Sequence, residues 1–295
     1  MLRSFLLLAL AALASGASAQ TPWRASADGP SVSLDIAYGS VTDILFTNDR
    51  GEALGEGRAD SYVGILSARV PVGARGAIVG SLPVALYAVR FNDTVGSIGA
   101  TQTSFDIGNP YVGFATRPLA GAEVEAGVWL PAATGGGVGF TPDVAAAGFS
   151  ADRENFEAYK TDVVSARLAL RGEADLSAAA SVRGEIAPVL SYYTGDLPTD
   201  GFGQELDLPR TNAAVTGAVF TDLRFSALAL TVGALGRYEP KGGTDRYFDE
   251  LFASGLAMVT YEGASVQPSL GVRVPLAAIS ASDFVLTAGV SVPLR

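Results

Sequence analysis

Hydrophobic and polar residues alternate with period two through most of this chain, most clearly in the C-terminal stretch 282–295. The apolar even positions of that stretch are Phe284, Leu286, Ala288, Val290, Val292 and Leu294. The stretch 264–275 alternates in the same way. Because successive side chains on a strand point to opposite faces, each stretch predicts a β-strand with one apolar and one polar face.

The length of these stretches indicates what the apolar face contacts. About ten residues, tilted by roughly 45°, cross the hydrocarbon of a bilayer as a strand. Stretches of this kind recur along the chain at 32–38, 62–71, 77–91, 106–116, 123–130, 163–171, 177–193, 212–220, 226–238, 251–261, 264–275 and 282–295. The sequence therefore predicts an all-β, up-and-down antiparallel transmembrane barrel of twelve strands. The two faces of 212–220 and 251–261 are ambiguous, because small residues occupy both.

The predicted connections alternate in length. The long ones are 41–60, 92–104, 131–161, 194–210 and 239–249, and 276–282, itself short, falls on the same side. The short ones are 72–75, 117–121, 172–175, 221–224 and the two-residue hairpin Glu262-Gly263. Bacterial outer-membrane barrels have short periplasmic turns and longer extracellular loops. The alternation therefore places both termini in the periplasm and every long loop outside.

The first residues predict export. Arg3 precedes the apolar run 5–13, and Ala17-Ser18-Ala19 follows, which together are typical of a secretory signal peptide spanning 1–19. Residues 20–295 then form one barrel domain in the cell outer membrane of a Gram-negative organism. Only 17% of residues are charged although 48% are hydrophobic, which fits a lipid-facing exterior.

Composition restricts the chemistry. The formal net charge of −10 argues against nucleic acid as a partner. The chain has no cysteine and no histidine, so neither thiol chemistry nor a Ser-His or Asp-His site is available. Glu123 and Glu125 lie about 7 Å apart on one strand face, near the spacing of paired-acid glycoside hydrolysis. We favour a lumen lining for both, and expect no enzyme activity, cofactor or metal.

If the polar strand faces point inward, charged residues line the lumen. The candidates are Asp35, Arg69, Glu123, Glu125, Arg167, Arg171, Arg183, Glu185, Arg237 and Arg273. Arginines predominate, and charged rings bias which solutes pass, so one hypothesis is a mildly anion-tolerant or unselective passage. The alternative is that Arg69, Arg167 and Arg183 pair with glutamates at 123, 125 and 185 on neighbouring strands.

Two loops are unusually acidic. The residues are Asp43, Asp49, Glu52, Glu56 and Asp60 in the first and Asp143, Asp152, Glu154 and Glu157 in the third. They could bridge to lipopolysaccharide phosphates through divalent cations, but none has the spacing of a calcium loop. We favour a solvated acidic surface.

The third loop, 131–161, is too long for a simple connector. Gly135-Gly136-Gly137 permits a sharp fold-back, and 144–159 could form a short helix. We predict that this loop folds into the lumen as a constriction, the alternative being a flexible lid over the mouth.

Three short motifs carry a family resemblance. They are Arg69-Val70-Pro71-Val72-Gly73, Ile107-Gly108-Asn109-Pro110-Tyr111-Val112-Gly113 and Gly127-Val128-Trp129-Leu130-Pro131. The chain resembles Gram-negative outer-membrane barrels, and in these motifs the porin-like transporters that include phenol-degradation meta-pathway barrels. It departs from many of them in ending Pro293-Leu294-Arg295 rather than in an aromatic residue.

The resemblance implies a passive porin-like channel for small solutes, with outer-membrane lipid and lipopolysaccharide as its surroundings. A non-conducting structural or adhesive barrel with partner-binding acidic loops is the alternative. A soluble periplasmic β-protein is a third interpretation.

Overall fold

The structure is a computed structural model that describes residues 29–47, 53–91, 101–133, 147–148, 151–195, 210–240, 251–262, 265–277 and 284–294. The side chains of 42–47, 53–56, 91, 101–102, 153 and 277 are also outside this description. The predicted signal peptide 1–19 therefore lies outside the described residues.

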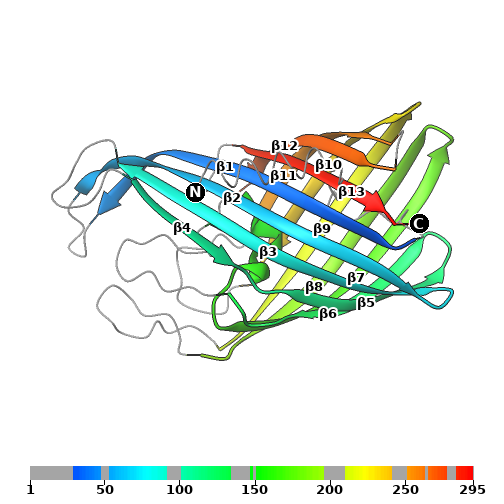
Figure 1. Ribbon diagram of the computed structural model, residues 1–295, viewed down its shortest axis with the longest axis horizontal. Coiled ribbons are helices and arrows are strands. Elements are labelled where there is room, and N and C mark those ends of the chain that lie inside the picture. Colours follow the sequence, from blue (N-terminus) through cyan, green and yellow to red (C-terminus); the bar gives the residue numbers. More distant parts are fainter. Residues whose placement is uncertain are drawn as a thin grey trace.

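The described strands form one closed antiparallel sheet (Figure 1). They are β1 Ser31–Thr47, β2 Ala53–Val72, β3 Gly76–Phe91, β4 Thr101–Ile107, β5 Tyr111–Leu119, β6 Ala122–Trp129, β7 Val163–Ser177, β8 Ala180–Tyr193, β9 Thr211–Phe225, β10 Leu228–Tyr238, β11 Leu251–Tyr261, β12 Gln267–Ala277 and β13 Val285–Pro293. The strands pair in sequence order, and β13 closes the ring by pairing with β1 from Ser31↔Pro293 to Gly39↔Val285. The predicted up-and-down barrel is confirmed.

β4 and β5 share one position in the ring. Both pair with β3, β4 through Val84–Arg90 and β5 through Gly76–Ser81. The predicted single strand 106–116 is therefore wrong in detail, because Gly108-Asn109-Pro110 interrupts it. Proline has no N–H to donate to a ladder, which favours a break at this point. Counted by position, the described barrel has the twelve strands that the sequence predicts.

The two barrel ends differ, as predicted. At one end, which we call the turn end, tight turns join the strands at 73–75, 120–121, 178–179 and 226–227. Gly73 and Gly121 adopt positive φ there, a conformation that glycine accepts without steric cost. The other end, which we call the loop end, has the longer connections. Figure 1 shows the C-terminus at the turn end.

Several predicted boundaries are wrong. Most of the predicted loop 41–60 is strand. Register shifts near Val41 and Phe46 interrupt the period-two pattern of β1, so the sequence does not show this part of the strand. The turns 172–175 and 221–224 lie further along the chain, because polar residues continue β7 and β9 past their apolar stretches. The hairpin Glu262-Gly263 is longer than two residues, since β11 ends at Tyr261 and β12 begins at Gln267.

Apolar side chains cover the exterior. Large hydrophobic residues that are more than a third exposed include Leu66, Val70, Ile78, Val112, Leu168, Val219, Val232, Val259, Leu270 and Leu286. Residues of the other face point inward and are buried, among them Ser33, Glu123, Arg183, Arg237, Ser254 and Arg273. An exterior of this kind is compatible with lipid and unusual for a soluble monomer.

One part of the interior is apolar. Phe220, Leu235, Leu256 and Met258 pack together from β9, β10 and β11. Because hydrophobic residues occupy both faces there, the alternation of 212–220 and 251–261 is weak in the sequence. Among the described residues, no helix is long and apolar enough to span a membrane.

Candidate functional site: a charged belt and an anchored plug in the lumen

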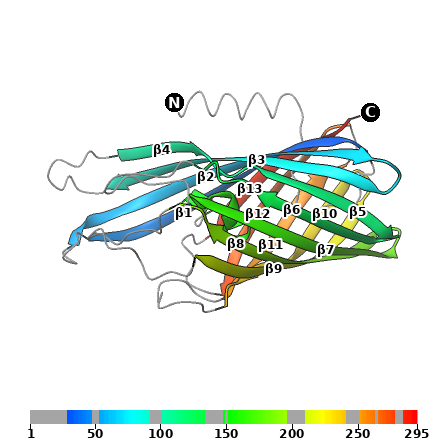
Figure 2. The same cartoon turned by 90° about the horizontal axis from the view of Figure 1, so that it is seen from below.

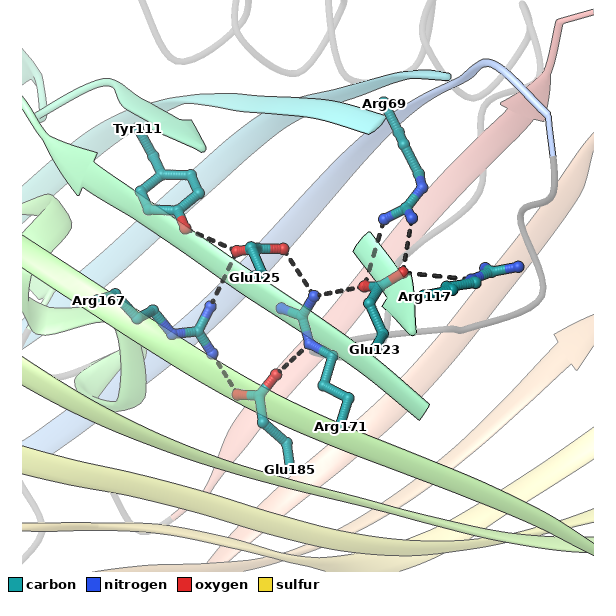
Figure 3. A network of polar contacts seen from close by, with 8 residues as sticks. All are labelled: Arg69, Tyr111, Arg117, Glu123, Glu125, Arg167, Arg171 and Glu185. Carbon is teal, nitrogen blue, oxygen red and sulfur yellow. Dashed lines mark hydrogen bonds and ion pairs between the residues drawn. The ribbon is translucent and has the colours of Figure 1, made fainter. Parts of the chain in front are cut away.

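A network of charged side chains crosses the lumen between β2 and β8 (Figure 3). We call it the charged belt, and it consists of Arg69, Arg117, Glu123, Glu125, Arg167, Arg171 and Glu185, with the Tyr111 hydroxyl at its edge. The residues come from β2, β5, β6, β7 and β8 and all lie on inward faces. The arginines of the belt outnumber its glutamates by one.

Arg171 lies at the centre of the belt and contacts three carboxylates. Its Nη1 lies 2.9 Å from an oxygen of Glu123 and 2.6 Å from one of Glu125. Its Nε donates to Glu185 at 2.6 Å. The Arg171 side chain is only 7% exposed, so these pairs are shielded from bulk water. Charge-assisted hydrogen bonds of this kind are about twice as strong as neutral ones.

The other arginines complete the belt from the sides. Arg69 contacts both oxygens of Glu123, at 2.6 and 3.4 Å. Arg117 contacts the same carboxylate at 3.4 Å but is more exposed. Arg167 pairs with Glu185 and lies 3.7 Å from Glu125, whose Oε1 accepts a hydrogen bond from Tyr111 at 2.7 Å. The predicted pairing across neighbouring strands holds for Arg167, whereas Arg69 reaches Glu123 across the positions of β3 and β5 in the ring and Arg183 pairs with no glutamate of the belt. Arg171 pairs with both Glu123 and Glu125, and its positive charge favours their ionised forms. Neither glutamate is therefore suited to donate a proton as a general acid.

A second group of residues lies inside the barrel and is not part of the wall. It comprises the described residues 151–160 of the long connection between β6 and β7, including the 3₁₀ helix η1 Arg153–Ala158. Figure 1 shows this segment within the barrel, and we call it the plug. Ala151, Glu157 and Tyr159 are at most 1% exposed. This described part agrees with the predicted fold-back into the lumen, whereas residues 134–146 and 149–150 lie outside the description.

Ion pairs attach the plug to the wall formed by β10, β11 and β12. Arg237 on β10 pairs with both carboxylate oxygens of Glu157, and Lys160 lies 3.3 Å from the same group. Arg273 on β12 pairs with Glu154, which also accepts a hydrogen bond from Ser254 at 3.2 Å. Both arginines are nearly fully buried. The plug is therefore held to one side of the barrel by two desolvated guanidinium–carboxylate pairs.

Asn109 attaches the plug to the opposite side, at the break between β4 and β5. Its side-chain amide donates to the backbone carbonyls of Glu157 and Lys160 at 2.9 and 2.6 Å. Its side-chain oxygen accepts the N–H groups of Ala132 and Ala133 at 2.9 and 2.8 Å. Asn109 is fully buried, so each bond satisfies a group that water cannot reach. The break in the strand is thus the attachment point for both ends of the connection.

Gly108 allows this close approach. A Cβ at Gly108 would lie 2.2 Å from the carbonyl oxygen of Ala158, which only glycine avoids. The motif Ile107-Gly108-Asn109-Pro110, which carries the family resemblance in the sequence, therefore holds the plug in this protein.

The acidic residues of the third loop correct one prediction. Asp152 and Glu157 are buried and the Glu154 side chain is 9% exposed, so the three are counter-ions of lumen arginines and not a solvated surface. Asp60 is also buried, on β2. The side chains of Asp43, Asp49, Glu52, Glu56 and Asp143 lie outside the described residues. The plug adds carboxylates to the lumen. The lumen is therefore less positively charged than the predominance of arginine among the predicted lining residues indicates.

The structure brings most of the predicted lining residues into two clusters. Arg69, Glu123, Glu125, Arg167, Arg171 and Glu185 form the belt, while Arg237 and Arg273 hold the plug. Arg183 lies apart, paired with Asp222 at 2.6 Å and stacked over Phe220 at 4.9 Å from the ring centroid. Asp35 lines the lumen cavity. Sequence reasoning misses Asn109 and Ser254, which carry no charge. It also misses Asp222, which falls in the predicted turn 221–224 but lies on β9.

A cavity of about 240 Å³ lies in the lumen between these clusters. The plug contributes Asp152, Glu154 and Asn155, and the belt contributes Arg167, Arg171 and Glu185. Apolar residues complete the lining, among them Tyr111, Trp129, Leu256 and Met258. Its volume fits a small molecule and is below the usual range of drug-sized sites.

The plug is expected to hold more tightly as the pH falls from 7 to 5. Burial raises the pKa of Asp152 to about 6, with Glu154 adding to the rise and Arg273 opposing it. In a released plug the pKa of Asp152 would be near 3.9. Asp152 therefore takes up a proton at a higher pH in the docked plug than in the released plug, and docking becomes more favourable as the pH falls through 6. Burial also disfavours ionised Glu157, but Arg237 and Lys160 outweigh this and hold the pKa of Glu157 at about 2. The attachment through Glu157 therefore persists above about pH 4.

If the barrel conducts, open probability in planar bilayers between pH 7.5 and 5 measures this effect. We expect a decrease of up to about tenfold per pH unit in the native chain. Asp152→Asn, which has no titrating group at this position, should flatten the profile. An increase in open probability over this range, or an unchanged slope in Asp152→Asn, would contradict the assignment.

Comparisons with known proteins support the fold. No protein-family model matches the chain, and no curated protein matches its sequence. An outer-membrane channel from Pseudomonas putida F1 is similar in structure, with a TM-score of 0.59 and 12% identity over 93% of this chain and 98% of that one. The transport unit of the autotransporter AIDA-I from Escherichia coli has a TM-score of 0.53 and 10% identity over 94% and 93%. The β domain of the Bordetella autotransporter BrkA has a TM-score of 0.51 and 9% identity over 90% and 100%.

These similarities define the class of fold. The chain has the closed antiparallel barrel of outer-membrane channels and transport domains, and the predicted resemblance to such barrels is confirmed at this level. The proteins compared are described as a channel and as autotransporter domains, not as enzymes.

Proposed function

We propose that the protein is a passive outer-membrane channel for small solutes, narrowed by the plug. The observation that carries this proposal is that the plug lies beside a lumen cavity and is attached by side chains rather than built into the sheet. Barrels of eight strands are filled by side chains, and those of 16 to 18 strands leave an open channel. A twelve-position barrel lies between these cases, so one segment is enough to set the width of its passage.

The outer membrane is the proposed location. The apolar exterior matches a bilayer, and the long and short connections separate to opposite ends as in bacterial outer-membrane barrels. A soluble periplasmic protein would gain nothing from either feature. Under this placement the loop end faces outward and the turn end faces the periplasm.

Weak charge selectivity is part of the proposal. In the belt four arginines face three glutamates. On the wall, Arg237 and Arg273 face plug carboxylates, among them Glu157 and Glu154. A ring of paired charges presents little net field to a passing ion. Small neutral and zwitterionic solutes fit this lining and the cavity volume.

Swelling of liposomes that contain the refolded protein tests passage. The native chain should admit a solute of glycine size and exclude a trisaccharide. A variant lacking 135–158 should admit both, because the deletion removes the plug except Tyr159 and Lys160 while the strands on either side remain linked. Absence of swelling in both would contradict the proposal and favour a non-conducting structural or adhesive barrel.

A further inference from the structure

A polar cluster lies on the outer face of β1, β2 and β3, away from the lumen. It consists of Tyr38, Arg58, Asp60 and Arg90, and we call it the outer arginine cluster. Leu66 and Val70, which have the same parity on β2 as Arg58, are about half exposed. Positions of the other parity, Ser61 and Val63, are buried. The cluster therefore belongs to the face that contacts lipid.

Its contacts leave two guanidinium groups sharing one carboxylate. Arg58 donates to Asp60 at 2.9 Å and to the Tyr38 hydroxyl at 2.7 Å, and that hydroxyl donates to Asp60 at 2.8 Å. Arg90 lies 3.6 Å from the other Asp60 oxygen. Asp60 is 2% exposed, whereas the side chains of Arg58 and Arg90 are 46% and 55% exposed. The carboxylate is enclosed and both arginines remain available on the surface.

The two arginines also face each other directly. Arg58 is the register partner of Arg90 across β2 and β3. Like charges in directly opposed positions destabilise a sheet, and a single carboxylate offsets only one of the two. An anion held between the guanidinium groups would remove this repulsion, and the planar fork of arginine suits the oxygens of a phosphate.

The position along the barrel indicates where the anion comes from. Arg58 lies eight residues from Leu66 toward the loop end, about 26 Å along the strand. Figure 2 shows β4 beside this loop-end extension of β1–β3. An arginine that faces lipid at the bilayer midplane is strongly unfavourable, but its cost falls to near zero at the interface. The cluster therefore marks the head-group level of the outer leaflet.

An aromatic pair lies next to the arginines. The rings of Tyr38 and Tyr62 are 4.8 Å apart between centroids, and the two residues are register partners on β1 and β2. Tyrosine is favoured where one end of the ring is apolar and the other end is polar, as at a membrane interface. The surface thus combines phosphate-binding cations with a platform for the adjoining acyl or sugar groups.

We propose that the outer arginine cluster binds a phosphate group of lipopolysaccharide in the outer leaflet. This inference rests on the outer-membrane placement proposed above. Contact is made directly by arginine, in contrast to the bridging of loop carboxylates through divalent cations that the sequence suggests. Asp60 orients Arg58 and offsets part of the local positive charge. The Tyr38 hydroxyl, which is hydrogen-bonded to both Arg58 and Asp60, holds the two side chains in place.

Binding of lipid A to the full barrel in nanodiscs tests the proposal, with bisphosphorylated and dephosphorylated lipid A as probes. The native chain should prefer the bisphosphorylated form by at least tenfold. Arg58→Gln and Arg90→Gln should each lose most of that preference. Arg75→Gln, which removes an exposed arginine from the turn end, should keep it. Asp60→Asn, which removes the shared counter-charge, should increase the preference.

Three outcomes would overturn the proposal. One is equal binding of the two lipids by the native chain, and another is an unchanged preference in both arginine variants. The third is displacement of lipid A by millimolar inorganic phosphate, which would show a general anion site. A chain that enters nanodiscs but does not discriminate between lipids contradicts only this inference. A chain that does not enter them contradicts the membrane placement itself.

Discussion

Replacing Arg237 and Arg273 together by glutamine is expected to detach the plug from the barrel wall. Removing one partner of a buried ion pair leaves an uncompensated charge and costs about 3–5 kcal/mol. Two such pairs hold the plug, through Glu157 and Glu154. The hydrogen bonds from Asn109 to the plug contribute about 0.5–1.5 kcal/mol each, which is too little to compensate. In the double variant we therefore expect the plug to be released in most molecules.

Thiol labelling measures this release, because the chain has no cysteine of its own. Ala158→Cys places a single thiol in the plug at a position that is 2% exposed. In the otherwise native chain labelling should be slow, and in the double arginine variant it should be at least a hundredfold faster. Arg224→Gln is a matched control, since Arg224 also has two acidic neighbours but is 35% exposed. Equal labelling rates in the double variant and the control would contradict the role of the two pairs.

Replacing Arg171 by methionine is expected to destabilise the barrel more than any other single change in the belt. Arg171 contacts Glu123, Glu125 and Glu185, and methionine would leave all three carboxylates buried with fewer counter-charges. We expect a loss of about 3–5 kcal/mol in the free energy of unfolding. Arg117→Met should cost less than about 1 kcal/mol, because Arg117 is more exposed and makes one 3.4 Å contact in the belt.

Urea unfolding of the barrel in lipid vesicles compares these variants. Adding Glu125→Gln to Arg171→Met should recover part of the loss, since one unpaired carboxylate is removed. The double-mutant cycle then gives the coupling between the two residues. Similar midpoints for Arg171→Met and Arg117→Met would show that the belt is hydrated and contributes little.

The fold could be predicted because a barrel in lipid, the placement proposed here, has one simple rule for every strand. Outward positions such as Leu66, Leu168 and Leu270 must be apolar, so period-two alternation survives in the sequence. The rule weakens where the interior is also apolar, as at Leu256 and Met258. It also weakens beyond the hydrocarbon, where polar residues continue strands such as β2 and β7. Boundaries are wrong mainly in those places.

The site could be predicted only in part. Which charged residues point inward follows from the alternation of inward and outward positions along each strand. Their partners, however, depend on contacts between residues distant in sequence. Arg237 and Glu157 are 80 residues apart, and Arg273 and Glu154 are 119 apart. One signal could have found them: the predicted lining has an excess of arginine, and the third loop has an excess of acid. Asn109 gives no such signal, because a buried amide is recognised only from the backbone groups around it.

Single-channel conductance of refolded protein in a planar bilayer, with and without 135–158, shows whether the barrel conducts and whether the plug narrows it. We expect small steps for the native chain and clearly larger steps after deletion, because the plug narrows a passage that the barrel otherwise leaves open. Steps of equal size would contradict the role of the plug. Silence in both proteins would contradict the channel itself.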